Sequence, residues 1–148
     1  MKRFVIVVAL LLAGCATGPD PFAPGTMIPG KLTALNDGHV IPVQIEITPM
    51  SRPTGMVSGT DPVTGEQFNG NYTFVVETKV VQQSQPGLLF DEQTSQAVQT
   101  SDVAPGTAVL VGNKGTVINL AITAKAGRPP VGYGNGEDNK GKKYALQF

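Results

Sequence analysis

A strict alternation between branched apolar and polar residues, from Ile41 to Thr48, most limits what this chain can fold into. In the run IPVQIEIT every second residue is isoleucine or valine, and the residues between them are proline or polar. A period of two places the apolar side chains on one face of a β-strand, whereas an amphipathic helix needs a period of about 3.6. The segment therefore predicts a strand with one face in a core and the other in water.

Further strand patterns recur along the chain, and turn residues separate them. Strands are expected at residues 30–35, 55–60, 67–81, 107–111, 116–124 and 142–148. The segments 36–38, 112–115 and 138–141 are tight-turn sequences, and Gly141 suits a positive φ. The 18 glycines and 12 prolines favour short strands and many turns. We predict an all-β domain of about seven or eight antiparallel strands, either a compact β-barrel or a two-sheet sandwich.

The N-terminus has the organisation of a secretory signal. The first three residues, MKR, are basic at two positions, and residues 4–12 are apolar. This apolar run is far shorter than the roughly 20 residues that span a bilayer. Leu12, Ala13, Gly14 and Cys15 resemble the lipobox of bacterial lipoproteins, in which the cysteine sulfur takes a diacylglycerol group and the cysteine becomes the first residue.

The alternative is an ordinary signal peptide in which Cys15 is incidental. Because Cys15 is the only cysteine of the chain, it has no partner for an internal disulfide, and acylation would remove a spare thiol. One acyl chain binds a membrane reversibly, whereas two or more hold a protein firmly. We therefore favour the lipid-anchored interpretation.

The signal divides the chain into three segments. Residues 1–14 are expected to be cleaved, residues 15–29 form a Pro/Gly-rich tether, and residues 30–148 form a single β-domain. The tether could instead end in an edge strand that begins near Thr26. Ala16 stands where an aspartate commonly retains Gram-negative lipoproteins in the inner membrane. The resemblance therefore implies the periplasmic face of the outer membrane.

Residues 82–105 lack a clean strand pattern and form the longest expected loop. Loops of this length are usually functional or disordered. The apolar triplet Leu88, Leu89 and Phe90 is too hydrophobic to lie comfortably in water. We expect a crossover loop that this triplet pins to the core; the alternative hypothesis makes the triplet a contact for a partner protein. Residues 91–98 could add one or two helical turns.

The residues that usually carry enzymatic chemistry are scarce. His39 is the only histidine, which excludes zinc sites built from several histidines, and we expect it to face solvent beside a turn. Lipid would occupy the Cys15 sulfur, and no serine lies in a nucleophile-elbow motif. The acidic pairs at 91–92 and 137–138 are interpreted as solvated turn charges. We predict no enzymatic activity, no cofactor and no metal.

The charge of the chain argues against nucleic acid as a partner. Cleavage of residues 1–14 removes two of the 11 basic residues, Lys2 and Arg3, and none of the 11 acidic ones, which leaves 134 residues with a net charge of −2. Without a basic stripe, such a chain cannot neutralise a row of phosphates. The expected partners are the membrane, through the lipid, and an envelope protein.

Two short segments resemble small bacterial lipoproteins of uncharacterised function. The C-terminal pattern of that family, G-x-G-x-C…D-x-x-G-x-x-Y-x-L-x-F, is similar to residues 132–148, with Asp138 and Tyr144 at matching positions. A D/N-P-x-T-G-E-x-F segment often precedes it, and residues 61–68 read DPVTGEQF. Gly136 stands where those proteins often carry cysteine, so no role of that cysteine transfers. The resemblance supports the fold class and implies no established activity.

The sequence thus favours a non-enzymatic lipoprotein of the cell envelope that binds or braces another component. A second hypothesis is an exclusion lipoprotein, encoded by a phage or plasmid, that occludes an outer-membrane receptor. A third is an envelope glycan-binding module or hydrolase. A cleft lined by Tyr72, Tyr133 and Tyr144 would strengthen the third hypothesis, whereas rings packed in the core would remove it.

Overall fold

The computed structural model describes residues 20–49, 51–84 and 94–148, and of residues 79–84 and 94–100 it describes the backbone alone. The lipobox, Cys15 and the triplet at 88–90 lie outside the described residues, so what we predict for them stays a prediction. Every regular element in the described part is a β-strand, which confirms the all-β prediction. The strands are β1 Met27–Ala34, β2 Val40–Glu46, β3 Thr54–Thr60, β4 Gln67–Phe74, β5 Thr78–Ser84, β6 Thr94–Thr100, β7 Val103–Gly112, β8 Val117–Lys125, β9 Val131–Asp138 and β10 Lys143–Gln147.

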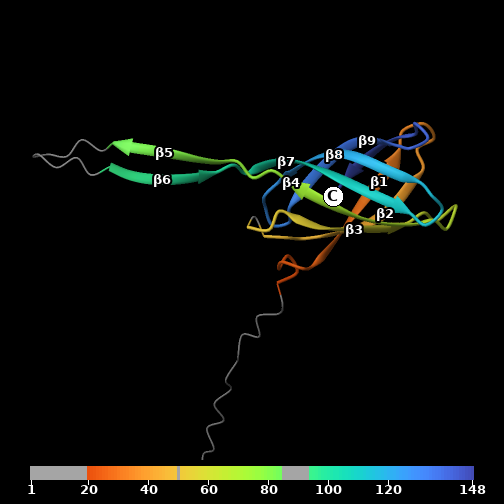
Figure 1. The fold of residues 1–148 in the computed structure, drawn as a ribbon. Coiled ribbons are helices and arrows are strands. Elements are labelled where there is room, and N and C mark those ends of the chain that lie inside the picture. The colour runs from red at the N-terminus through yellow and green to blue at the C-terminus, as the bar shows by residue number, and fades with distance from the viewer. Residues whose placement is uncertain (1–19, 50, 85–93) are drawn as a thin grey trace, which may run out of the picture.

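Eight of these strands close into an antiparallel barrel, in the order β1-β10-β9-β8-β7-β4-β3-β2 (Figure 1). Closure comes from β1, which pairs with β2 on one side and with β10 on the other. A closed barrel leaves no unpaired sheet edge, whereas a sandwich would leave several. Of the two architectures that the sequence left open, the chain adopts the barrel.

The inner face of the barrel is the hydrophobic core. In β2, Ile41, Val43 and Ile45 are buried, and the residues between them are exposed, as the alternation predicts. The core cluster is Ile28, Leu32, Ala34, Ile41, Val43, Ile45, Val57, Phe68, Tyr72, Ala108, Leu110, Ile118, Leu120, Ile122, Tyr144 and Leu146. Full burial of one large aliphatic or aromatic side chain contributes about 1.5–3 kcal/mol, so this cluster is the main source of stability.

Glycines on the inner face make room for large rings that arise from other strands. A Cβ atom at Gly55 would lie 2.6 Å from the Tyr72 hydroxyl oxygen, and one at Gly132 would lie 2.1 Å from the Phe148 ring. Small barrels commonly alternate small and large interior residues so that side chains fill the lumen. The inner glycines of β9 allow close packing in the same way: Gly132 lies against the Phe148 ring, and Gly134 and Gly136 lie against the backbone of β8.

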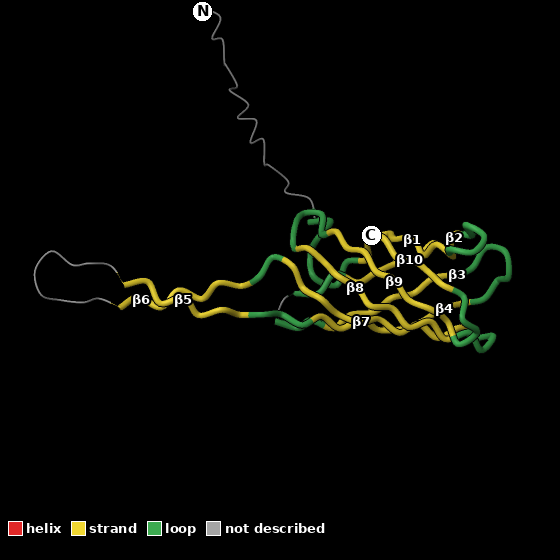
Figure 2. Tube along the Cα trace, turned by 90° about the horizontal axis from the view of Figure 1, so that it is seen from above, coloured by secondary structure: helices red, strands yellow, loops and turns green. Residues whose placement is uncertain are grey.

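The barrel has two ends of different construction. The turn end carries the short connections 35–39, 61–66, 113–116 and 139–142. The open end carries residues 20–26 and the connections 47–53 and 126–130. Figure 2 shows that the β5–β6 ribbon extends from this end and that the described N-terminal residues lie there too.

The prediction of a loop at residues 82–105 is wrong, because strands occupy much of this segment. β5 and β6 pair with each other over Thr78–Ser84 and Thr94–Thr100, and β7 begins at Val103. The expected strand at 67–81 is divided in two, and the helical turns at 91–98 are replaced by β6 from Thr94 onward. The ribbon extends away from the barrel in Figure 1, so neither face needs the alternating pattern that identifies a half-buried strand.

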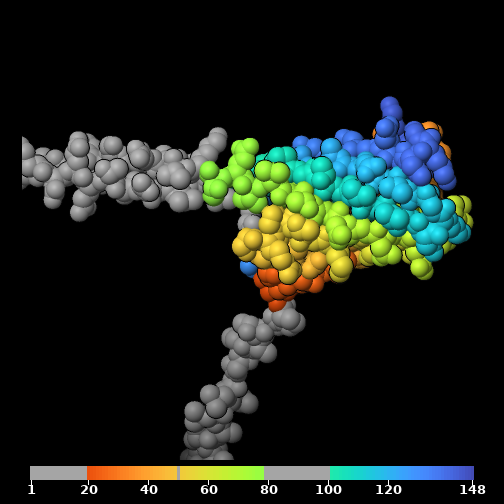
Figure 3. All heavy atoms as spheres, in the orientation of Figure 1, coloured from red at the N-terminus to blue at the C-terminus, as the bar shows by residue number. Residues whose placement is uncertain are grey.

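The N-terminal boundary of the barrel also differs from the expected one. β1 begins at Met27, three residues before the predicted start, and its hydrogen bonding reaches further back. The Gly25 amide donates to the Ile47 carbonyl, and Phe22 packs against the core. In Figure 3 the red residues at the start of the described chain lie directly against the yellow part of the barrel. Of the predicted 15–29 tether, residues 20–29 therefore belong to the folded domain.

Candidate functional site

An apolar cavity occupies the open end of the barrel, with a volume of about 390 Å³. Three half-buried aromatic rings, Phe22, Phe74 and Phe148, form part of its wall, together with Ile28 and Ile45. Small-molecule sites in proteins usually occupy about 300–1,000 Å³ and are lined mainly by apolar side chains. The cavity therefore has the size and the character of a site for a small apolar ligand.

Two alanines explain why space remains at this end. Ala104 on β7 and Ala124 on β8 are direct cross-strand partners, and both line the cavity. Deeper in the barrel, the same face of β8 carries Ile122, which is buried in the core. On the inner face of β8, the large side chain of Ile122 is followed by the small side chain of Ala124 at the open end. The lumen is therefore not filled there, and the cavity remains.

A single tyrosine brings a hydroxyl group to the cavity wall. The Tyr72 hydroxyl donates to the Glu46 carbonyl oxygen at 2.5 Å and lies 2.9 Å from the Thr48 hydroxyl. Burial raises the pKa of Tyr72, and the Glu46 carboxylate raises it further, although the Thr48 hydrogen bond acts in the opposite direction. The hydroxyl is neutral at ordinary pH and already has its partners, so it adds little polarity to the wall.

Charged side chains surround the cavity at its rim. Arg128 donates to the Asp20 carboxylate at 2.6 Å, and Arg52 lies 3.5 Å from the Glu46 carboxylate. Lys125, the last residue of β8, also lines the cavity and is exposed to solvent. In the described part of the chain it forms no ion pair within 4.0 Å. The rim therefore offers one cation that a ligand could use.

At the turn end, a buried carboxylate organises the 61–66 connection. Asp61 is 6% exposed, and its Oδ1 accepts hydrogen bonds from the Val63 and Thr64 amides, at 2.8 and 3.3 Å. Its Oδ2 accepts from the Thr64 hydroxyl, and the His39 Nε2 lies 2.8 Å from Oδ1. Burial by itself would raise the pKa of Asp61, but these hydrogen bonds outweigh it and hold the pKa at about 2. The arrangement commits the carboxylate to holding the turn.

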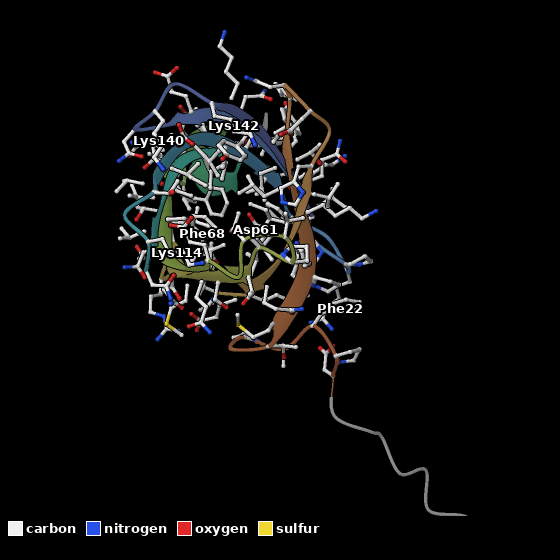
Figure 4. All side chains as sticks on the ribbon, turned by 90° about the vertical axis from the view of Figure 1, so that its right-hand side faces the viewer. Phe22, Asp61, Phe68, Lys114, Lys140 and Lys142 are labelled. Carbon is white, nitrogen blue, oxygen red and sulfur yellow. The ribbon has the colours of Figure 1, made fainter. Side chains whose placement is uncertain are left out.

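Two more carboxylates hold the neighbouring turns in the same way. Glu66 accepts from the Lys114 amide and from both the amide and the hydroxyl of Thr116, at 3.0–3.2 Å. Asp138 accepts from two backbone amides of its own turn and from the Tyr144 hydroxyl at 3.2 Å. Figure 4 looks down the barrel from this end, with Asp61 toward the middle of the ring of strands.

Burial of the ring raises the pKa of Tyr144 to about 12, and the adjacent Asp138 carboxylate adds to the effect. In the described residues, no buried polar side-chain atom lacks a hydrogen-bond partner. The polar groups of the turn end are thus committed to the fold.

The predicted chemistry-bearing residues are not brought together into a site. His39 does not face solvent as expected, because it is partly buried against Asp61, which comes from a turn 22 residues later. Tyr72 lies at the open end and Tyr144 at the turn end, both in the core, and Tyr133 is 63% exposed on the outer face. They share no cleft in the described structure, so the arrangement that would strengthen the glycan-binding hypothesis is not found there. Within the ranges described, no cluster of three or more His, Cys, Asp or Glu side chains is placed to hold a metal.

Sequence reasoning missed the cavity itself. Ala104 and Ala124 read as unremarkable residues of a loop and of a strand, and nothing in either position signals a pocket. Only the pairing of β7 with β8 shows that two small residues meet at one end of the lumen. The aromatic residues of the wall come from the N-terminal segment, from β4 and from the C-terminus, so no local motif joins them.

Comparisons with known proteins give no analogy for this site. A scan of protein-family models found no match, and searches of curated proteins and of solved structures found no significant match either. In the part of the chain that is described, no helix is both long and apolar enough to cross a membrane. The function must therefore be argued from the cavity and its position.

Proposed function

We propose that this protein is a lipid-anchored, non-enzymatic binding module of the cell envelope, held at the periplasmic face of the outer membrane, whose ligand site is the apolar cavity. The observation that carries the proposal is the position of this cavity relative to the start of the described chain. Phe22 and Pro24 belong to the cavity wall, and only four residues separate Asp20 from Cys15 in the sequence. A lipid on Cys15 would hold the open end close to the membrane surface.

The polar contacts support binding over catalysis. The carboxylates that could act as acids or bases, Asp61, Glu66 and Asp138, are occupied by turn amides and hydroxyls at the opposite end. The cavity wall is mainly apolar, and its polar side chains are Thr48, Tyr72 and the charged residues of the rim. Apolar surface transferred from water contributes about 25 cal/mol per Å², so such a wall supports affinity without providing reactive groups.

The anchor is tested by cell fractionation of the Cys15→Ser variant. We expect wild-type protein to be processed and recovered with outer membranes, because the thiol is the acceptor of the lipid. The variant should stay unprocessed and carry no lipid in an intact-mass measurement. A variant that is matured normally and still fractionates with membranes would disprove the anchor.

The cavity is tested by titrating the mature polypeptide carrying Cys15→Ser with an apolar fluorescent dye. The Ala124→Leu substitution adds three carbon atoms to the cavity wall, and we expect it to weaken dye binding at least about fivefold. Ala121→Leu is the matched control, since Ala121 lies on the same strand but is exposed on the outer face. Equal weakening by both substitutions, or by neither, would rule out the cavity as the site.

A further inference from the structure

The cavity at the open end combines three properties that together specify a ligand: a narrow apolar volume, closeness to the lipid attachment point and one cation on the rim. We propose that it takes up a single acyl chain of an anionic lipid from the membrane that carries the protein, with the lipid head group beside Lys125. This inference rests on the proposed function, because it needs the anchor at Cys15.

The size and lining of the cavity favour one alkyl chain over a folded partner. Its volume of about 390 Å³ lies near the lower limit for small-molecule sites. Phe22, Phe74 and Phe148 enclose it from three separate parts of the chain, and Ile28 and Ile45 form its inner wall. A flexible hydrocarbon chain fills such a space without needing hydrogen bonds, and the wall offers almost none.

The distance to the anchor favours a lipid of the bilayer as the source of that chain. An extended chain covers at most about 3.3–3.6 Å per residue, so the five residues from Cys15 to Asp20 span at most roughly 18 Å. Asp20 is held at the rim through its ion pair with Arg128, 2.6 Å long. The mouth of the cavity therefore stays within a short reach of the acyl chains around the anchor.

The charges at the rim favour a negatively charged head group. Glu46 faces Arg52, and Asp20 faces Arg128, so these four charges balance in pairs. Lys125 forms no ion pair with any described carboxylate within 4.0 Å, although it lines the cavity. A phosphate placed beside its ammonium group would complete the pairing of the rim charges.

The test uses the lipidated full-length mature protein in vesicles of phosphatidylcholine and phosphatidylglycerol. A small fraction of the phosphatidylglycerol carries a photoreactive diazirine at the end of one acyl chain. After irradiation, flotation of the vesicles separates bound protein, and mass spectrometry locates the adducts. We expect adducts in the peptides that contain Phe22, Phe74 and Ala104, which line the cavity.

Two substitutions provide the controls. Ala124→Leu should lower the yield of these adducts at least about fivefold, whereas Ala121→Leu on the outer face should leave it unchanged. Lys125→Gln changes an exposed residue, so the fold is retained. It should lower the yield about two- to fivefold with the phosphatidylglycerol probe and by a smaller factor with a phosphatidylcholine probe, whose choline cation balances the phosphate.

The outcomes separate this inference from the proposed function. Adducts confined to the outer face or to residues beside Cys15 would overturn it, and so would exclusion of the probe by the protein's own acyl chains. In either case the protein would still float with the vesicles, and the anchor would stand. Failure to float would instead contradict the anchor itself.

Discussion

The buried carboxylate of Asp61 should make the stability of the barrel depend on pH in a defined interval. Its pKa is about 2 in the folded protein, against an ordinary value of 3.8. Because folding lowers this pKa, the ionised Asp61 carboxylate stabilises the folded protein at pH values above the unfolded pKa. This stabilisation is lost as the pH falls through about 2. At about 1.36 kcal/mol per pKa unit, the full contribution is about 2 kcal/mol.

The change that isolates this contribution is Asp61→Asn, since asparagine has similar size and no titrating group. Urea unfolding of both proteins is measured at about pH 5 and about pH 2, an interval that spans the unfolded and the folded pKa of Asp61. By the linkage relation, wild-type protein should lose about 2 kcal/mol relative to the variant as the pH falls. The other carboxylates cancel in this difference.

A stability difference between the two proteins that stays constant, within about 0.5 kcal/mol, at the two pH values would contradict this role of Asp61. Such a result would mean that the amides of Val63 and Thr64 do not hold the Asp61 charge in solution as they do in the structure. The 61–66 turn would then be fixed by its backbone alone.

Two further predictions concern packing and titration in the barrel. Gly55→Ala places a Cβ 2.6 Å from the Tyr72 hydroxyl oxygen, and it should lower the free energy of unfolding by about 1–3 kcal/mol, measured by heat or urea. The control is Met56→Ala, beside it on the outer face, which should change the free energy of unfolding by less than about 0.5 kcal/mol. Equal effects of the two substitutions would contradict the close packing at Gly55. Tyr144 should ionise at about pH 12, which is followed by its phenolate absorbance, and this late step should be absent in Tyr144→Phe. The same substitution removes the hydrogen bond to Asp138 and should lower the free energy of unfolding by about 1 kcal/mol. Since folding raises this pKa, the stabilisation is complete below about pH 10 and is lost as the pH rises through about 12; an unchanged titration curve in the variant would show the assignment to be wrong.

Much of the fold could be predicted because local signals and tertiary packing agree. The alternation at 41–48 predicts a one-sided strand, and β2 is one. The tight-turn sequences at 36–38, 112–115 and 138–141 lie at the turn end, and Gly141 has the predicted positive φ, 80°. These features depend on neighbours in the sequence, which is why pattern and turn chemistry suffice to find them.

The features that escaped prediction depend on distant residues or on burial. The partner of His39 lies 22 residues away, and an aspartate in a turn gives no sign that it will be buried. The motif at 61–68 resembles a family segment, but only the structure shows that its Asp61 and Glu66 hold turns together. The ribbon of β5 and β6 was missed because its sequence lacks the alternation that identifies a half-buried strand, and the ribbon extends away from the barrel (Figure 1).

The central claim is that the cavity and the lipid anchor lie at the same end of the barrel. Since lipid would occupy Cys15, the only cysteine, one added cysteine can carry a unique fluorophore. Ala126→Cys labels the exposed rim of the cavity, and Lys140→Cys labels the exposed turn end. In lipidated protein bound to vesicles, a quencher on the lipid head groups should quench the label at 126 much more strongly than the label at 140. Equal quenching, or stronger quenching at 140, would contradict the account.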